Sequence, residues 1–256
     1  MSENKDIPFE QMNDRGEYTS NISSAETIVP MLIDYVHPAS VIDIGCATGV
    51  WLNQFKLESQ NKIRVCGIDG EWLKDCSSFL NDDEIVYFDL EDTNAPFPVK
   101  DRFDLAICLE NAEHISRNRA DFLIDTLTKL SDIVYFSAAT PFSGGQHHVN
   151  ERWQSYWLNK FKDRGFICCD VIRPRTWNNR RVAYFYSQES FLYVSENAIG
   201  KYPDLKAASG DIKFVDVVHP ELYVNQVVKP SHDWPYLRSM LKRTVQSMVV
   251  KAITRQ

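Results

Sequence analysis

A chain of 256 residues is long enough for one α/β domain with additions and too short for two full domains. Its formal net charge of -7 disfavours a broad nucleic-acid-binding surface, so we expect no nucleic-acid partner. The first residues, M-S-E-N-K-D-I-P-F-E, have neither a basic start nor an apolar core, and no apolar run reaches the length of a membrane span, so we expect a cytoplasmic protein with no transmembrane segment.

The chain begins with a polar stretch. Residues 1–24 show no clear periodicity, which indicates an N-terminal arm or a lid over a site. Apolar residues recur at helical spacing over residues 26–35, which predicts a helix with Ser23 or Ser24 as its N-cap. Pro38 ends this helix and the first strand follows.

A small-residue turn between a strand and a helix is the most informative stretch. Residues 41–44 predict a short strand buried on both faces, and residues 50–58 predict a helix. Between them, Gly45 and Gly49 can adopt positive φ or leave room for a ligand near the backbone, and the amides that begin the helix favour an electron-rich partner. Asp43 lies inside the apolar strand, where a carboxylate is costly to bury without a polar partner.

This D-x-G-x-x-x-G pattern resembles motif I of the class I S-adenosylmethionine-dependent methyltransferases, whose loop lies under the amino-acid end of the cofactor. The alternative, a G-x-G-x-x-G dinucleotide fingerprint, would need glycines where the chain has Ala47 and Val50. The resemblance implies a methyltransferase that uses S-adenosyl-L-methionine.

Two further strands end in acidic residues. Residues 63–68 predict a strand that leads to Asp69, about twenty residues after Gly49, where nucleotide-binding α/β folds hold a ribose diol. Residues 84–88 predict the next strand, which leads to Asp89, and the resemblance implies that Asp89 accepts a hydrogen bond from the adenine amino group. The candidate cofactor-binding residues are Asp43, Gly45, Cys46, Gly49, Trp51, Asp69, Gly70, Asp89, Leu90 and Leu109.

The remaining elements complete the expected fold. F-D-L-A at the start of residues 103–109 resembles the usual opening of the fourth strand in this superfamily. The later elements are a helix over 121–130, a strand over 133–138, a helix from Asn150 or Glu151 to Gly165, and strands over 166–172 and 181–186 as an antiparallel pair. We therefore expect a Rossmann-like, seven-stranded, mostly parallel sheet with an antiparallel edge hairpin and helices on both faces.

The predicted domain organisation has three parts. The methyltransferase domain covers residues 25–195, after the arm of residues 1–24. Residues 196–256 form a C-terminal extension that ends in an amphipathic helix from Tyr236. That helix can dock on its own domain, pair with a second subunit to form a homodimer, or meet a peripheral partner or membrane surface.

Two unusual segments follow the fourth and fifth strands, where ligands bind in open α/β sheets. They are E-N-A-E-H at residues 110–114 and G-G-Q-H-H-V-N-E at residues 144–151. Histidines and carboxylates there can act as general bases on an acceptor hydroxyl, so the catalytic candidates are His147, His148, Glu113 and His114. The E-x-x-E-H spacing also resembles that of the small-RNA 3′-end 2′-O-methyltransferases, which implies a divalent metal held by Glu110, Glu113, His114 and His148. In many metal-free methyltransferases, a Glu-His pair like Glu113 and His114 follows the fourth strand and only shapes the cofactor pocket.

The acceptor is suggested by a second resemblance. G-G-Q-H-H-V-N-E-R-W and the following arginine-rich segment resemble a bacterial methyltransferase group associated with capsule and other surface-polysaccharide biosynthesis. Arg173, Arg175, Arg180 and Arg181 can hold a phosphate or an acidic sugar, or can form a solvated hairpin. We therefore expect methyl transfer to an oxygen, or else a nitrogen, of a small anionic, phosphorylated or nucleotide-linked precursor. The alternatives are a metal-dependent RNA 2′-O-methyltransferase and a non-catalytic partner protein with the same fold.

Overall fold

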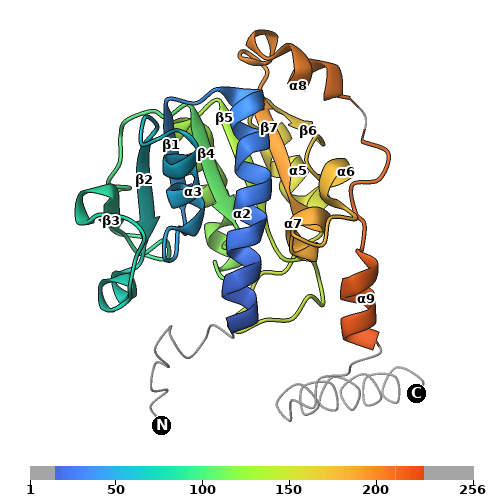
Figure 1. Ribbon diagram of the computed structural model, residues 1–256, viewed down its shortest axis with the longest axis horizontal. Helices are drawn as coiled ribbons and strands as arrows, with labels where there is room; N and C mark the ends of the chain where they lie inside the picture. The colour runs from blue at the N-terminus through green and yellow to red at the C-terminus, as the bar shows by residue number, and fades with distance from the viewer. Residues whose placement is uncertain (1–14, 211, 228–256) are drawn as a thin grey trace, which may run out of the picture. The chain divides into compact units, whose positions relative to one another are not determined.

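The computed structural model describes residues 15–210 and 212–227, and its centre is a seven-stranded sheet with the strand order β3-β2-β1-β4-β5-β7-β6 (Figure 1). Strands β1 to β5 are parallel to one another, whereas β7 is antiparallel to both β5 and β6. The strands are β1 Ser40–Ile44, β2 Arg64–Asp69, β3 Ile85–Tyr87, β4 Leu105–Leu109, β5 Ile133–Ser137, β6 Phe166–Cys169 and β7 Phe191–Ser195. This arrangement confirms the predicted fold class.

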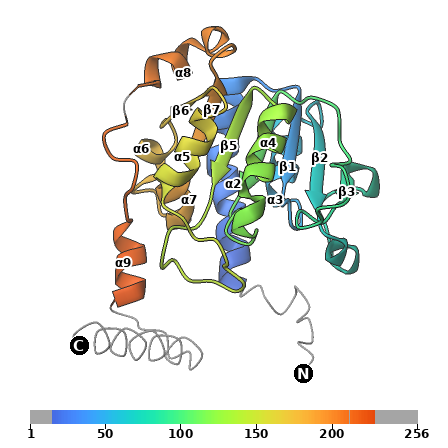
Figure 2. The same ribbon diagram turned by 180° about the vertical axis from the view of Figure 1, so that it is seen from behind.

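Helices cover both faces of the sheet because successive strand residues point to opposite sides. In β1, Val41 packs with α2 Arg15–Val36 and α3 Val50–Glu58, whereas Ile42 and Ile44 pack with α4 Ala120–Leu130 and α5 Gln154–Lys162. Figures 1 and 2 show these two helical layers from opposite sides. The shorter helices are α6 Arg173–Thr176, α7 Tyr184–Glu189, α8 Pro203–Ala208 and α9 Pro220–Val227.

The strand order reverses between β1 and β4. From β1 the chain continues outward through β2 and β3, and it then returns to place β4 on the other side of β1. The loops that follow β1 and β4 consequently leave the same edge of the sheet in opposite directions. Ligands of open α/β folds bind in the crevice between two such loops.

The position of the last strand differs from the prediction. Residues 181–186 contain no strand: they lead into α7, and the strand is β7, at residues 191–195. Residues 182–186 are apolar and aromatic, as in a strand, but they lead into α7, and Val182 and Tyr186 pack into the core beside α2 and α3. All five residues of β7 are buried, since β7 lies between two strands and has helices on both faces, so the strand shows no polar alternation.

Helix α2 begins earlier than expected, at Arg15, and so includes residues that were assigned to the N-terminal arm. Ser23 and Ser24 lie within it and do not cap it: Ser23 Oγ donates to the Arg181 carbonyl at 2.6 Å, and Ser24 Oγ accepts from the Ala183 amide at 2.9 Å. Polar side chains that hydrogen-bond to another segment explain why the apolar periodicity fades there. Residues 1–14 of the predicted arm lie outside the described residues.

Helix α5 begins at Gln154, later than the predicted Asn150 or Glu151. The preceding backbone is held by other partners: the amides of Val149 and Asn150 both donate to the Glu113 carbonyl, at 2.9 and 3.0 Å. These bonds direct the chain along the end of β4 before a helix can form.

Part of the predicted C-terminal extension packs on the sheet domain. The Arg173 guanidinium donates to the carbonyls of Phe214 and Val215, and the Ser155 amide donates to Asp216 at 2.7 Å. A second compact unit starts at Pro220 with α9. The helix predicted from Tyr236 lies outside the described residues, and none of the helices within them is long and apolar enough to cross a membrane.

Candidate active site

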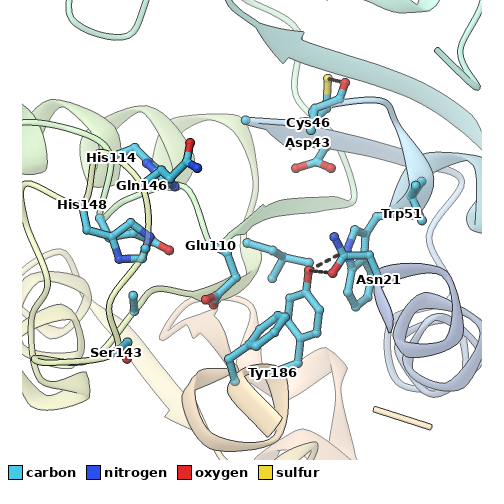
Figure 3. A pocket seen from close by; sticks show the side chains of 18 of the residues that line it. Asn21, Asp43, Cys46, Trp51, Glu110, His114, Ser143, Gln146, His148 and Tyr186 are labelled. Carbon is cyan, nitrogen blue, oxygen red and sulfur yellow. Dashed lines mark hydrogen bonds between the residues drawn. The ribbon is translucent and has the colours of Figure 1, made fainter. Parts of the chain in front are cut away.

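Two pockets open at the carboxyl ends of the central strands. The first, here called the central pocket, has a volume of about 460 Å³ and lies between the glycine turn after β1, the loop after β4, the histidine loop at residues 143–148 and residues 184–186 (Figure 3). The second, the lateral pocket, has a volume of about 780 Å³ and lies at the ends of β2 and β3. Both pockets are lined by His114, so they are neighbours.

The glycine turn is tightly packed against the side chains of Asn111 and Leu80. Gly45 and Gly49 have φ of 81° and 80°, in the left-handed region that favours glycine. A Cβ atom on Gly45 would lie 2.3 Å from Asn111 Cγ, and one on Gly49 would lie 2.4 Å from Leu80 Cγ. Both positions therefore require glycine, for conformation and for space.

Asp69 at the end of β2 is tied directly to this turn. Its Oδ2 atom accepts from the Ala47 amide at 2.7 Å, and its Oδ1 atom accepts from the Gly70 amide at 2.7 Å. Burial raises the pKa of Asp69, and the hydrogen bonds from Ala47, Gly70 and Trp72 oppose that shift. The second predicted carboxylate, Asp89, is exposed and lines the same lateral pocket, with its Oδ1 atom accepting from the Glu91 amide at 2.8 Å.

Asp43 is the buried carboxyl group of the central pocket. Only 3% of the residue is exposed, and its Oδ1 atom has no hydrogen-bond partner within the described part of the chain. Burial, followed by the charge of Asp69, raises the pKa of Asp43 well above its usual value. A ligand or a water molecule can complete the hydrogen bonding of such a buried polar atom.

The structure distributes nine of the ten candidate cofactor residues between the two pockets and leaves Gly49 outside both, packed against Leu80. The central pocket is lined by Asp43, Gly45, Cys46, Trp51 and Leu109, and the lateral pocket by Asp69, Gly70, Asp89 and Leu90. Asn111, which the sequence analysis did not single out, lines the lateral pocket and packs on Gly45.

Glu113, His114 and His148 converge in the central pocket. One ligand atom from each side chain lies within 4.8 Å of the others. The two imidazole rings meet edge to face with centroids 4.8 Å apart. Glu113 is only 1% exposed, and its Oε2 atom has no hydrogen-bond partner among the described residues. Burial, together with His148, lowers the pKa of His114 to about 4, so its imidazole is neutral at pH 7.

The other two candidates at these strand ends lie apart from this cluster. Glu110 lines the central pocket but does not belong to the group of three. His147 is exposed and lines neither pocket, and its backbone hydrogen-bonds to His114. Of the two adjacent histidines, only His148 therefore faces the central pocket.

Glu151 holds the histidine loop together. Its carboxylate accepts from the amides of Phe142 and Gly144, at 2.8 and 2.9 Å, and contacts His148 Nδ1 at 3.1 Å. The loop needs this support because Phe142 and His147 both have positive φ, at 71° and 58°. With Nδ1 donating to Glu151, the Nε2 atom of His148 remains available as an acceptor.

We expect Glu151→Ala to loosen the histidine loop without unfolding the domain. The substitution removes three hydrogen bonds, each worth about 0.5–1.5 kcal/mol, from a segment that is mostly exposed. Hydrogen exchange should show faster exchange at the Phe142 and Gly144 amides, while the amides of the buried strands keep their protection. Unchanged exchange at both loop amides would contradict this role of Glu151.

An aromatic wall, of which the sequence analysis singled out only Trp51, closes the opposite side of the central pocket. Trp51 Nε1 donates to the Tyr186 hydroxyl at 3.3 Å, and that hydroxyl donates to Asn21 Oδ1 at 3.3 Å (Figure 3). Tyr184 and Phe185 extend the wall. The sequence analysis overlooked Tyr184, Phe185 and Tyr186 because it assigned residues 181–186 to a strand.

The arginine cluster does not form an anion site at either pocket. Arg173 is buried and donates to Asp170 and to three backbone carbonyls. Arg181 pairs with Glu26 at 2.7 Å, and the Arg175 guanidinium lies 5.1 Å from the Tyr35 ring centroid. Neither pocket has an arginine or lysine among its described lining residues.

The strand order, the glycine turn after β1 and the carboxylates at the next strand ends define the class I methyltransferase fold. The sequence model of the methyltransferase domain family matches residues 23–182. The match covers more than half of the chain, so the chain belongs to this family and is a methyltransferase that uses S-adenosyl-L-methionine. No curated protein matches the sequence significantly.

Solved structures with the same fold have little sequence identity to this chain. The plantazolicin methyltransferase BpumL, in complex with a pentazolic desmethylPZN analog and SAH, has a TM-score of 0.52 and 15% identity, over 73% of this chain and 89% of its own. DesVI of Streptomyces venezuelae has a TM-score of 0.52 and 10% identity, over 75% and 100%. Magnesium protoporphyrin IX methyltransferase from Synechocystis PCC 6803 has a TM-score of 0.50 and 18% identity, over 75% and 86%. At these identities the similarity shows the fold alone.

Proposed function

We propose that S-adenosyl-L-methionine lies across both pockets, with its methionine end in the central pocket and its adenosine in the lateral pocket. The unpartnered Oδ1 atom of Asp43 fits the ammonium group of the cofactor, because a buried carboxyl oxygen needs a donor. Asp69 and Asp89 line the lateral pocket together and would bind the ribose and the adenine. The bound cofactor supplies an electrophilic methyl group on its sulfonium.

The methyl group goes, in this proposal, to an oxygen of a small molecule bound in the central pocket, with nitrogen as the second choice. The observation that carries this proposal is the convergence of Glu113, His114 and His148 in the pocket that the glycine turn also lines. These groups can orient the acceptor hydroxyl and accept its proton, which contributes about 10²–10⁴ to a rate. Alignment of the oxygen with the sulfonium methyl group supplies much of the remainder.

The same three side chains form a candidate site for a divalent metal. Glu113 offers an oxygen with no partner among the described residues, and His114 is neutral at pH 7. The Glu151 carboxylate contacts Nδ1 of His148, a contact that can orient the ring so that Nε2 binds a metal. A bound divalent ion would polarise the acceptor oxygen and lower the pKa of its hydroxyl. The predicted fourth ligand, Glu110, is not within the group of three.

For the acceptor we retain a precursor of surface-polysaccharide biosynthesis, on the resemblance of the histidine loop and the segment after it. No basic side chain other than histidine lines the central pocket among the described residues. The phosphates of a phosphorylated or nucleotide-linked precursor would therefore lie outside this pocket, while the group to be methylated enters it.

Methyl-labelled cofactor incubated with hydroxylated metabolites, phosphorylated sugars, nucleotide-linked sugars and short RNAs tests these alternatives. We expect label in a small molecule. If the three side chains hold a metal, EDTA should lower the rate by at least about 10²-fold, because a metal contributes several kcal/mol to stabilisation of the transition state, and added Mg²⁺ or Mn²⁺ should restore it. A rate unaffected by EDTA would assign the three groups to general-base catalysis.

Two other outcomes would replace the proposal. Label in RNA, with binding that weakens steeply with salt, would favour the RNA 2′-O-methyltransferase. Binding of S-adenosylhomocysteine without methylation of any acceptor would favour a non-catalytic partner protein.

A further inference from the structure

The central pocket has an acidic lining. Three carboxyl groups line it, from Asp43, Glu110 and Glu113, and its described lining includes no lysine or arginine. Asp43 and Glu113 are 3% and 1% exposed, and each has a buried oxygen with no hydrogen-bond partner among the described residues. Ionised carboxylate oxygens only accept hydrogen bonds, so in that form these groups favour molecules that bring donors or positive charge.

The cofactor accounts for only part of this requirement. In the proposed arrangement its ammonium group meets Asp43, on the side of the pocket formed by the glycine turn. Glu113 lies with His114 and His148, where the acceptor oxygen is expected. Glu110 is a third carboxyl group that neither of these roles uses.

Glu110 lies between the two sides of the pocket. It directly follows β4 and has a φ of 49°, an uncommon conformation for a residue other than glycine. Figure 3 shows its carboxylate between His148 and Tyr186. Its charge contributes, after burial, to raising the pKa of the Tyr186 hydroxyl, which agrees with a carboxylate close to the aromatic wall.

The aromatic wall provides a second attraction for a cation. Trp51, Tyr184, Phe185 and Tyr186 all line the pocket that contains Glu110. Ring faces attract cations, and they do so more strongly where water is excluded. A carboxylate that shares a pocket with these rings can therefore bind an ammonium group.

We propose that the acceptor carries an amino group and that Glu110 and the aromatic wall bind it as an ammonium ion. This inference rests on the proposed function, since it places the reacting oxygen of the same molecule near Glu113 and His148. Glu110 would then be a specificity-determining residue that favours amino compounds over neutral and phosphorylated analogues. A phosphate in its place would add negative charge to a pocket with no lysine or arginine in its described lining.

A binding experiment with three matched probes tests the inference without knowledge of the natural acceptor. The probes are 3-amino-1-propanol, 1,3-propanediol and 3-hydroxypropyl phosphate, titrated into the complex with S-adenosylhomocysteine and followed by NMR chemical shifts. EDTA is present so that phosphate cannot bind through a metal ion. We expect the amine to bind at least about tenfold more tightly than the diol, in line with a desolvated charge interaction, and the phosphate to bind most weakly.

Glu110→Gln keeps the shape of the side chain and removes its charge, so it should bring the amine and the diol within about twofold of each other. Glu58→Gln, an exposed change on α3, serves as the control and should keep the wild-type preference. Equal or tighter binding of the diol or phosphate to the wild-type protein, or an amine preference that survives in Glu110→Gln, would overturn the inference.

The two proposals can fail separately. The probe titration tests amine binding whether or not any small molecule is methylated. A failure to methylate any small molecule would count against the proposed function alone. Methylation of an amino compound at its only nitrogen would overturn the inference, because an ammonium ion held at Glu110 has no lone pair to attack the sulfonium methyl group.

Discussion

Asp69→Ala should weaken the binding of S-adenosylhomocysteine by about 10²-fold. Asp69 is the carboxylate that joins the two halves of the expected cofactor site, because it lines the lateral pocket and also accepts from the Ala47 amide in the glycine turn, at 2.7 Å. Loss of one to two hydrogen bonds to a charged group, each worth about 1.5–3 kcal/mol, corresponds to a change of this size. Isothermal titration calorimetry measures it directly.

The controls separate contact with the cofactor from support of the turn. Asp69→Asn keeps one oxygen that can accept from the Ala47 amide, so it should preserve the turn better than alanine while still weakening binding. Asp89→Ala removes an exposed carboxylate that accepts a hydrogen bond from the Glu91 amide, and we expect a smaller loss of affinity, about tenfold. If Asp69→Ala bound S-adenosylhomocysteine as tightly as the wild-type protein, the proposed cofactor position would be wrong.

The sequence predicted best the features that depend on local pattern. The strand, glycine turn and helix at residues 40–58 follow from the apolar run, the two glycines and the helical residues after them, and the structure has these elements at the expected residues. Asp69 and Asp89 could be placed at strand ends because parallel strands all finish at one edge of the sheet. Position along the chain was enough to bring them into one pocket.

Features that depend on tertiary contacts were harder to predict. Residues 181–186 and 191–195 are both aromatic-rich, and only the insertion of the latter between β5 and β6 decides which segment is the strand. Similarly, Arg173 belongs to an arginine-rich run but is held inside the fold by carbonyls of Phe214 and Val215, about forty positions along the chain. Such long-range partners leave no local signal.

Of all pairs of neighbouring residues, we expect His147 and His148 to differ most in how much their replacement by alanine lowers the rate of methyl transfer. The sequence could not choose between them, because the direction of each side chain depends on the unusual backbone of the loop, with φ of 151° at Gly145 and 58° at His147. In the structure His148 lines the central pocket beside Glu113 and His114, whereas His147 is exposed and outside both pockets.

We therefore expect His148→Ala to lower the rate of methyl transfer by about 10²–10⁴-fold, the usual contribution of a proton-accepting or acceptor-orienting group. His147→Ala, one residue away, should change the rate by no more than about threefold, because the His147 side chain is exposed and lines neither pocket. Affinity for S-adenosylhomocysteine should stay near the wild-type value in His147→Ala, which shows that the fold is intact. The measurement is single-turnover transfer from methyl-labelled cofactor to an acceptor identified in the screen. Equal losses in the two variants, or a greater loss in His147→Ala, would show that the histidine loop adopts another arrangement when the acceptor binds.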